Sequence, residues 1–237
     1  MWSHGIVDAS IGSGESVSFQ NMICRACDRS NSSVDVRQTL YVNGIYELPF
    51  GRGKQFLNHG GVASHIFGGW ELSGIAAARS GLPVNITMTR KASQMLDGNT
   101  SSQRPRLVPG VSIYAPTRTI NAWFNPAAFS TPAMYTWGNL GRCAATGPSN
   151  YEFDTSLQKR FLVTERLALN FRATAYNLFN NPQYANPASN LSKSSFGTIT
   201  DILNDGATGS GAPRRIEFYS VLSSDPRRRP PAAGAPV

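Results

Sequence analysis

Hydrophobic and polar residues alternate along several long stretches of the chain. In NYEFDTSLQKRF, residues 150–161, mostly apolar positions from Tyr151 to Phe161 alternate with charged and polar ones. A period of two is typical of β-strands, whose successive side chains point to opposite faces. The same alternation predicts further strands at residues 2–8, 33–48, 70–88, 166–176 and 214–222. The strand over 70–88 should be kinked by Gly81 and Pro83.

The connections between these predicted strands differ greatly in length. The turn around Thr164 and Glu165 takes a few residues, whereas residues 10–32, 89–149 and 180–212 form long polar connections. Long alternating strands with alternately short and long loops are typical of transmembrane β-barrels. A soluble β-sandwich also alternates, but its strands are usually shorter than the stretches seen here. Aromatic residues near the strand ends resemble an interfacial girdle: Tyr46, Phe50, Trp70 and Phe161.

We therefore predict an all-β fold, an antiparallel meander of about six long strands that forms a partial transmembrane β-barrel with long extracellular loops. If the last strand ends on the periplasmic side, residues 10–32 and 89–149 are extracellular, and residues 49–68 are periplasmic. The connection over 49–68, which contains FGRGK, is long for a periplasmic turn.

Composition agrees with a loop-rich β protein. Only 15% of residues are charged, against about 25% in an average globular domain. The net charge is +8, but part of it comes from Arg227, Arg228 and Arg229, next to a Pro-rich end. We therefore expect no nucleic-acid partner, a barrel domain over residues 1–223 and a disordered tail over 224–237.

A set of motifs in fixed order resembles a known family. The motifs are LPFGRGK, GGWELSG, SGLPVNIT, WFNPAAF, GNLGR, FDTSLQKRF and LNFRATAYNLFNNPQY. Together they resemble the C-terminal β-barrel of TonB-dependent outer-membrane receptors, in the branch with an N-terminal carboxypeptidase regulatory-like domain. The resemblance spans roughly residues 2–222 and departs from the family at Thr174, where Glu is usual, and at Cys143, where Asn is usual. The family commonly ends on an aromatic residue soon after its last strand, whereas here SSDPRRRPPAAGAPV follows Leu222.

The resemblance implies localisation in the outer membrane of a Gram-negative bacterium and contact with membrane lipid. It also implies a barrel segment that serves active uptake of a bulky solute, of the oligosaccharide or siderophore class. In the parent protein, an N-terminal plug and the TonB system would be partners. About six strands are fewer than the eight of the smallest single-chain barrels, so we expect a fragment that does not transport alone. The alternative is a secreted or cell-surface β-sandwich that binds carbohydrate.

Candidate ligand-binding residues fall into two groups. The long outer loop carries the aromatic residues Trp123, Phe124, Phe129, Tyr135 and Trp137, which could stack on sugars or staple the loop onto itself. The lumen wall should carry Arg37, Glu152, Asp154, Arg160 and Arg172. Glu152 and Asp154 share a strand face and could suggest a glycosidase, but a charged lumen wall explains them better.

Other motifs give no sign of catalysis. FGRGK lacks the upstream Gly and the Ser or Thr of a phosphate-binding loop, so a turn after Pro49 is the better interpretation. Cys24 and Cys27 could form a disulfide or remain thiols, and a zinc site would need a second pair. The three histidines lie in unrelated segments, and no nucleophile elbow occurs. We therefore expect no enzyme activity, cofactor or metal.

Overall fold

A computed structural model describes residues 1–7, 19–21, 23–100, 102–164, 167–203 and 212–224. The chain forms two compact units. The first, which we call the loop unit, comprises Met1–Leu40, Ala78–Tyr151 and Pro182–Asp205. The second, the sheet unit, comprises Tyr41–Ala77, Glu152–Asn181 and Gly206–Val237. Among the described residues, no helix is long and apolar enough to cross a membrane.

Five long strands form the main sheet: β3 (Thr39–Glu47), β4 (Trp70–Arg79), β11 (Asn150–Leu162), β12 (Leu167–Tyr176) and β13 (Arg215–Ser224). The helical elements are η1 (Arg25–Asp28), α1 (Val62–Phe67), η2 (Ala92–Gln94) and η3 (Pro126–Ala128). The remaining strands are short: β1 (Ile6–Val7), β2 (Ser30–Asn31), β5 (Pro83–Val84), β6 (Arg106–Leu107), β7 (Tyr114–Thr119), β8 (Ala122–Phe124), β9 (Phe129–Ser130) and β10 (Ala145–Thr146).

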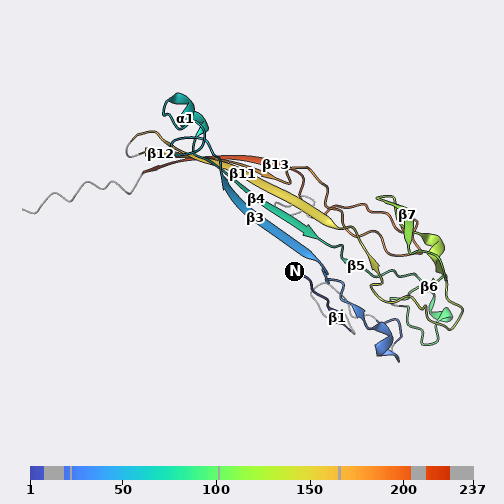
Figure 1. Cartoon of the computed structure of the whole chain (residues 1–237). Helices are drawn as coiled ribbons and strands as arrows, with labels where there is room; N and C mark the ends of the chain where they lie inside the picture. Colours follow the sequence, from blue (N-terminus) through green and yellow to red (C-terminus); the bar gives the residue numbers. More distant parts are fainter. Residues whose placement is uncertain (8–18, 22, 101, 165–166, 204–211, 225–237) are drawn as a thin grey trace, which may run out of the picture. The chain divides into compact units, whose positions relative to one another are not determined.

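The main sheet is a meander in which each long strand lies beside its neighbours in sequence. Its order is β13-β12-β11-β4-β3 (Figure 1), and both β11–β12 and β12–β13 are antiparallel. The bonds Leu48 N–H to Trp70 O and Ser80 N–H to Gln38 O run in opposite chain order, so β3 and β4 are antiparallel as well. The predicted all-β antiparallel meander is therefore confirmed, as an open sheet with β3 and β13 at its edges.

The strand register keeps the two alternating patterns on separate faces. On one face, which we call the apolar face, Leu157 lies opposite Ala173, and Ala173 lies opposite Phe218. On the other, the polar face, Gln158 lies opposite Arg172, and Ser156 opposite Thr174. A shift of one residue would mix the two sets, so this register is the one that the alternation specifies.

The apolar face is strongly exposed. Phe218 is 74% exposed, Leu222 64% and Leu72 42%. Trp70 makes edge-on contacts with Phe161 and Phe171 on this face, each with ring centroids 6.0 Å apart. A soluble protein rarely leaves such a surface uncovered, whereas a lipid-facing sheet requires it.

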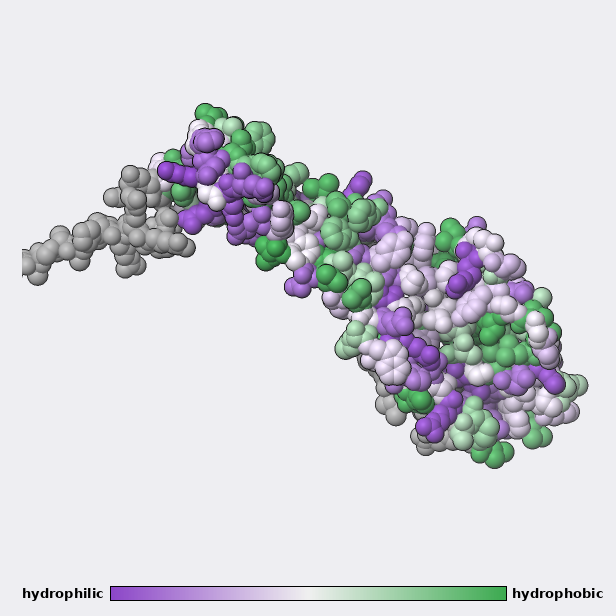
Figure 2. Space-filling model, viewed as in Figure 1, coloured by the Kyte–Doolittle hydropathy of each residue, from purple (hydrophilic) through white to green (hydrophobic). Residues whose placement is uncertain are grey.

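The connection over 49–68 is a folded element, which explains its length. Lys54 N–H donates to Gly51 O, so FGRGK is the predicted turn, and Gly51 and Gly53 both have positive φ. Helix α1 follows the turn, and its exposed apolar side chains give hydrophobic surface in Figure 2. A Cβ on Gly68 would lie 2.6 Å from the Cα of Gly51, so only glycine fits where the turn meets the helix end.

Lysine 159 ties α1 to the sheet. Its Nζ donates to the carbonyl oxygens of His65 and Ile66, 2.9 Å from the latter, near the end of α1. The same Nζ lies 4.5 Å from the centroid of Phe161 and 5.5 Å from that of Trp70. Trp70 Nε1 also donates to Ile66 O. A lysine on the apolar face is thus paired with carbonyls and rings instead of facing hydrocarbon alone.

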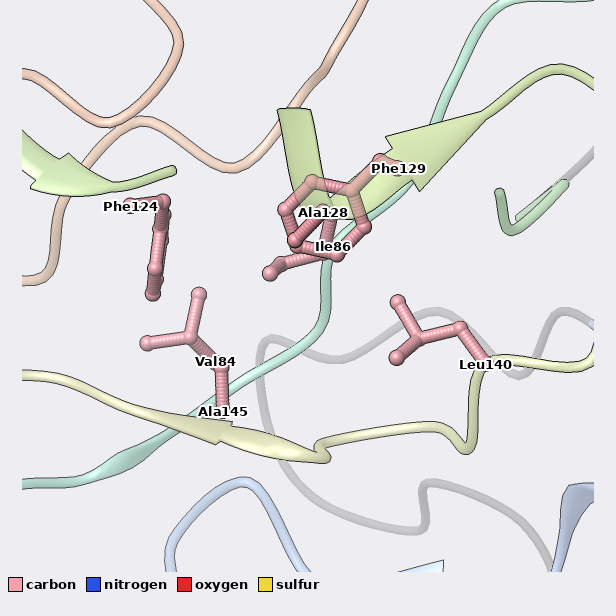
Figure 3. Close-up of a cluster of buried hydrophobic side chains, with 7 residues drawn as sticks. All are labelled: Val84, Ile86, Phe124, Ala128, Phe129, Leu140 and Ala145. Carbon is pink, nitrogen blue, oxygen red and sulfur yellow. The ribbon is translucent and has the colours of Figure 1, made fainter. Parts of the chain in front are cut away.

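The loop unit has a conventional hydrophobic core. Its buried cluster gathers residues from β5 and the residues just after it and from two segments of the long connection (Figure 3): Val84, Ile86, Phe124, Ala128, Phe129, Leu140 and Ala145. Phe196 packs on this cluster, with ring centroids 5.6 Å from Phe124 and 5.7 Å from Phe129. Full burial of one such ring contributes about 1.5–3 kcal/mol. The long connection is therefore a packed structure and not an extended loop.

Buried arginines hold the loop segments together. Arg104 forms a buried ion pair with Asp28, and its Nε donates to Leu140 O over 2.8 Å. Arg90 donates to the carbonyl oxygens of Thr136, over 2.6 Å, and Ala133, over 3.0 Å. Arg142 donates to Ser30 Oγ over 3.0 Å and to Val7 O over 3.2 Å. These bonds satisfy carbonyls that the irregular loop backbone leaves without strand partners.

Two strand predictions need correction. The strand expected over 33–48 begins only at Thr39, because Asp35 N–H donates to Ser32 O in a turn and the Asp35 carboxylate accepts Gly5 N–H over 2.9 Å. Residues 2–8 give only the short β1 and a bridge from Trp2 to Gln38, while residue 8 lies outside the described residues. The main sheet therefore has five strands where about six were expected.

The predicted kink over 70–88 is confirmed and has a simple cause. The stretch divides into β4 and β5 between Arg79 and Pro83. A Cβ on Gly81 would lie 2.0 Å from Gly147 O, so the backbone can pass there only as glycine. The tail predicted over 224–237 lies outside the described residues after its first position, which is the end of β13.

Candidate functional site

Four of the five charged lumen candidates lie on β11 and β12. Asp154 and Arg172 line a small pocket of about 130 Å³ together with Ser73, Ser156 and Thr174. Arg160 and Arg172 line a second pocket, of about 440 Å³, with Glu71 and Gln158. Asp154, Arg160 and Arg172 therefore lie on the polar face, with Arg172 common to both pockets, and their role in a lumen wall stays a prediction.

The two carboxylates proposed as a pair have different surroundings. Asp154 Oδ1 accepts the backbone N–H of Asn177 over 2.8 Å, which fixes the chain as it leaves β12. Glu152 is only 9% exposed. Asp154 therefore has a structural task in the sheet unit, and a glycosidase gains no support from this arrangement.

Arg37 is the fifth charged candidate. It belongs to the loop unit, ahead of the first residue of β3. Its guanidinium donates to Asn31 Oδ1 over 3.0 Å and lies 3.7 Å from the Asp35 carboxylate. Arg37 therefore precedes β3, which begins two residues later, and its place on a lumen wall stays a prediction.

The five loop aromatics divide between core and surface. Phe124 and Phe129 are 2% and 8% exposed in the cluster of Figure 3, which fits the stapling alternative. Trp137 is half-buried, and its Nε1 is buried without a hydrogen-bond partner among the described residues. Tyr135 is 55% exposed and has a positive φ of 60°. Ligand binding by these side chains remains a prediction.

Trp123 lines a groove of about 880 Å³ in the loop unit. The groove forms where β4 ends and β11 begins, and it is bordered by the β7–β8 hairpin. Its lining includes two arginines, two aromatic side chains and several hydroxyl or amide groups: Arg79, Arg118, Trp123, Tyr151, Thr39, Ser80, Thr146, Ser149 and Asn150. No aspartate or glutamate is among its lining residues.

The hairpin fixes the position of Arg118 at the groove. Its guanidinium carbon lies 5.2 Å from the ring centroid of Tyr114 and 5.4 Å from that of Trp123. Both rings are themselves held: Thr146 N–H donates to Tyr114 Oη over 3.0 Å, and Trp123 Nε1 donates to Thr146 O over 3.0 Å. Arg118 is thus placed by cation–π contacts with two anchored rings.

Sequence reasoning missed most of this groove. Arg79, Arg118, Tyr151 and Asn150 come from three segments that are distant in the sequence, so no local pattern joins them. One usable signal existed: Thr119 pairs with Ala122 across a two-residue turn, which makes Arg118 and Trp123 neighbours. A hairpin prediction over TRTINAW would have placed them together.

The cysteines and acids give no metal site. Cys24 and Cys27 form a disulfide, which resolves the two possibilities left open by the sequence. Cys143 is buried and takes no part in this disulfide. Within the part of the chain that the structure describes, no group of three or more His, Cys, Asp or Glu side chains could hold a metal ion.

An antiparallel meander of long strands with one exposed apolar face defines the class of transmembrane β-barrels. The family model of the outer membrane beta barrel domain matches residues 1–217. The chain therefore belongs to this family, its location is the outer membrane, and its apolar face meets membrane lipid. No curated protein and no solved structure matches the chain. The family match decides between the barrel and the soluble β-sandwich considered from the sequence.

Proposed function

We propose that the chain is part of the transmembrane barrel of a TonB-dependent receptor that takes up a bulky solute of the oligosaccharide or siderophore class. The observation that carries the proposal is the combination of a lipid-facing sheet with a loop unit that has its own core. A passive pore needs no packed loop structure, whereas a receptor needs a rigid surface that recognises its solute. The ordered motifs from LPFGRGK to NLFNNPQY support the same family branch.

The proposed role is binding and uptake without covalent chemistry. The polar face offers a wall of charged and hydroxyl groups. In this wall Arg172 donates a hydrogen bond to Ser156 Oγ over 3.2 Å, and Gln158 Nε2 donates one to Glu71 Oε1. Such a wall suits passage of a hydrated solute. The purified protein should hydrolyse glycosides no faster than background. Replacing Glu152 or Asp154 by the matching amide should therefore leave that rate unchanged.

Five strands do not close a barrel, since the smallest single-chain barrels have eight. Both edge strands, β3 and β13, therefore need further strands beside them before a lumen exists. In the proposed receptor these strands, the plug and the TonB contact come from the same polypeptide as the barrel.

Energised uptake tests the proposal. The complete coding region that contains these residues should support uptake of a labelled solute in cells with an intact TonB system. Uptake should be lost when TonB is deleted or the proton gradient is collapsed, while the amount of protein in the outer membrane stays constant. Uptake that continues without TonB would show a passive pore and would overturn the proposal.

A further inference from the structure

We infer that the groove of the loop unit binds an acidic oligosaccharide, one whose sugar units bear carboxylate or sulfate groups. This inference rests on the proposed function, because it names the solute class that the receptor would take up. Three properties of the groove carry it: its charge, its hydroxyl-rich lining and its size.

The groove is positively charged and lacks acids. Arg79 and Arg118 are its charged side chains, and neither has a carboxylate partner among the described residues. An arginine without a partner carboxylate presents a planar set of N–H donors that matches a carboxylate or sulfate. The buried arginines of the loop unit are bonded within the fold: Arg104 binds Asp28, and Arg142 binds Ser30 and Val7. The two groove arginines therefore differ from the structural arginines of the same unit.

The position of Arg118 is set before a ligand arrives. Its guanidinium is flanked by the rings of Tyr114 and Trp123, and both rings are anchored on Thr146. A side chain held in this way loses little conformational freedom on binding an anion. The arrangement is typical of a recognition residue and unlike a freely solvated surface charge.

The rest of the lining suits a polyhydroxylated ligand. Thr39, Ser80, Thr146 and Ser149 offer hydroxyl groups, and Tyr151, which is 60% exposed, offers a ring on which a sugar can stack. Asn150 is 8% exposed, and its Oδ1 is buried without a hydrogen-bond donor among the described residues. Such an acceptor gains a bond when a hydroxyl group of a ligand reaches it.

The size of the groove favours an oligomer over a single ion. Its volume of about 880 Å³ lies near the upper end of the usual range for ligand pockets, about 300–1,000 Å³. Charge, hydroxyl lining and volume together select an acidic oligosaccharide over a neutral sugar or a simple anion.

Binding of tetragalacturonate to the purified full chain in detergent tests the inference, with its fully methyl-esterified form as the matched neutral probe. Calorimetry should show binding of tetragalacturonate that weakens with added salt, and binding of the ester weaker by about tenfold or more. Equal affinity for the acid and the ester would overturn the charge argument. Tighter binding of lipopolysaccharide phosphate than of tetragalacturonate would assign the groove to an envelope glycolipid and overturn the inference as well.

Substitutions locate the binding site. Arg118→Gln and Arg79→Gln should each weaken tetragalacturonate binding by about tenfold, since each removes a charged hydrogen-bond donor. Arg118→Lys should fall between Arg118→Gln and the unchanged chain, because it keeps the charge and loses the planar donors. The control is Arg106→Gln, at an exposed arginine of the loop unit outside the groove. Equal effects of Arg106→Gln and Arg118→Gln would place binding elsewhere and overturn the inference.

Failure of this inference and failure of the proposed function are distinguishable. Binding in detergent needs neither TonB nor a proton gradient, so it reports on the groove alone. Suppose that the protein takes up a neutral solute in a TonB-dependent way and does not bind tetragalacturonate. This result would support the proposed receptor function and contradict the proposed acidic ligand. Tetragalacturonate binding without TonB-dependent uptake would support the ligand proposed for the groove and contradict the proposed receptor function.

Discussion

The two units of this chain place their hydrophobic residues in opposite ways. In the loop unit, Phe124 and Ile86 are 2% and 1% exposed, and charged groups such as Arg104 are buried only with partners. In the sheet unit, Phe218 and Leu222 are 74% and 64% exposed, and Ala168 is the only buried hydrophobic residue among the described ones. The loop unit thus resembles a water-soluble domain, while the sheet unit turns its apolar side chains outward.

The difference reflects two environments: water around the loop unit and membrane hydrocarbon at the apolar face of the sheet unit. Water drives apolar side chains inward, because burial removes them from it. Hydrocarbon gives no such drive, so a sheet in lipid must satisfy its backbone polar groups internally and can leave apolar side chains outside. The same alternating pattern that would define a half-buried strand in water defines a lipid-facing strand here.

The largest effect is expected from breaking the buried ion pair of the loop unit. Arg104→Met leaves Asp28 buried without its cation, so the free energy of unfolding of this unit should fall by about 3–5 kcal/mol. The exposed arginine two positions along gives the matched control, Arg106→Met, which should change little. Hydrogen exchange should show the loss in the loop unit alone. An equal loss in the sheet strands would contradict the separation of the two units.

The next effect tests the sheet unit with one substitution on each face. Ala173 lies on the apolar face and Thr174, the next residue of β12, on the polar face. Ala173→Arg should cost up to about 2–4 kcal/mol, the value for an arginine that faces lipid at the bilayer midplane, whereas Thr174→Arg, opposite Glu217, should cost much less. Folding titrations of the complete protein in lipid vesicles measure both values. Equal costs would mean that both faces meet the same solvent.

A smaller effect is expected where the helix α1 joins the sheet. Lys159→Met removes the donor that binds the carbonyl oxygens of His65 and Ile66, and hydrogen bonds from charged groups contribute about 1.5–3 kcal/mol. Amide exchange in α1 should accelerate accordingly. The control is Lys54→Met, whose ion pair with Glu47 is exposed and should leave α1 unchanged. Unchanged exchange in the Lys159 variant would show that α1 holds without this contact.

The smallest effect should follow reduction of the disulfide between Cys24 and Cys27. It closes a loop with a sequence separation of only three residues, so it constrains the unfolded chain little. Reduction should shift the melting temperature of the loop unit less than Arg104→Met does, and should leave the sheet unit unchanged. A larger shift than that of Arg104→Met would give the disulfide, and not the buried ion pair, the main part in stabilising the unit.

The sheet could be predicted from the sequence because each strand is specified by the alternation of apolar and polar residues within its own segment. Alternation in residues 150–161 and 166–176 determines both the strands and the face of each side chain, and β11 and β12 follow these limits closely. The late start of β3 could not be predicted, because it depends on Asp35 meeting Gly5, 30 residues away. The groove depends likewise on contacts between distant segments, such as Tyr114 with Thr146. Local periodicity carries no information about such pairs.

The location of the two sheet faces is the central claim, and accessibility to quenchers tests it most directly. Single cysteines at positions 173 and 174, in a chain with Cys24, Cys27 and Cys143 replaced by serine, would carry a polarity-sensitive fluorophore in the outer membrane. The label at position 173 should be quenched by a lipid-soluble quencher and the label at 174 by an aqueous one. Aqueous quenching at both positions would contradict the assignment of the apolar face to lipid.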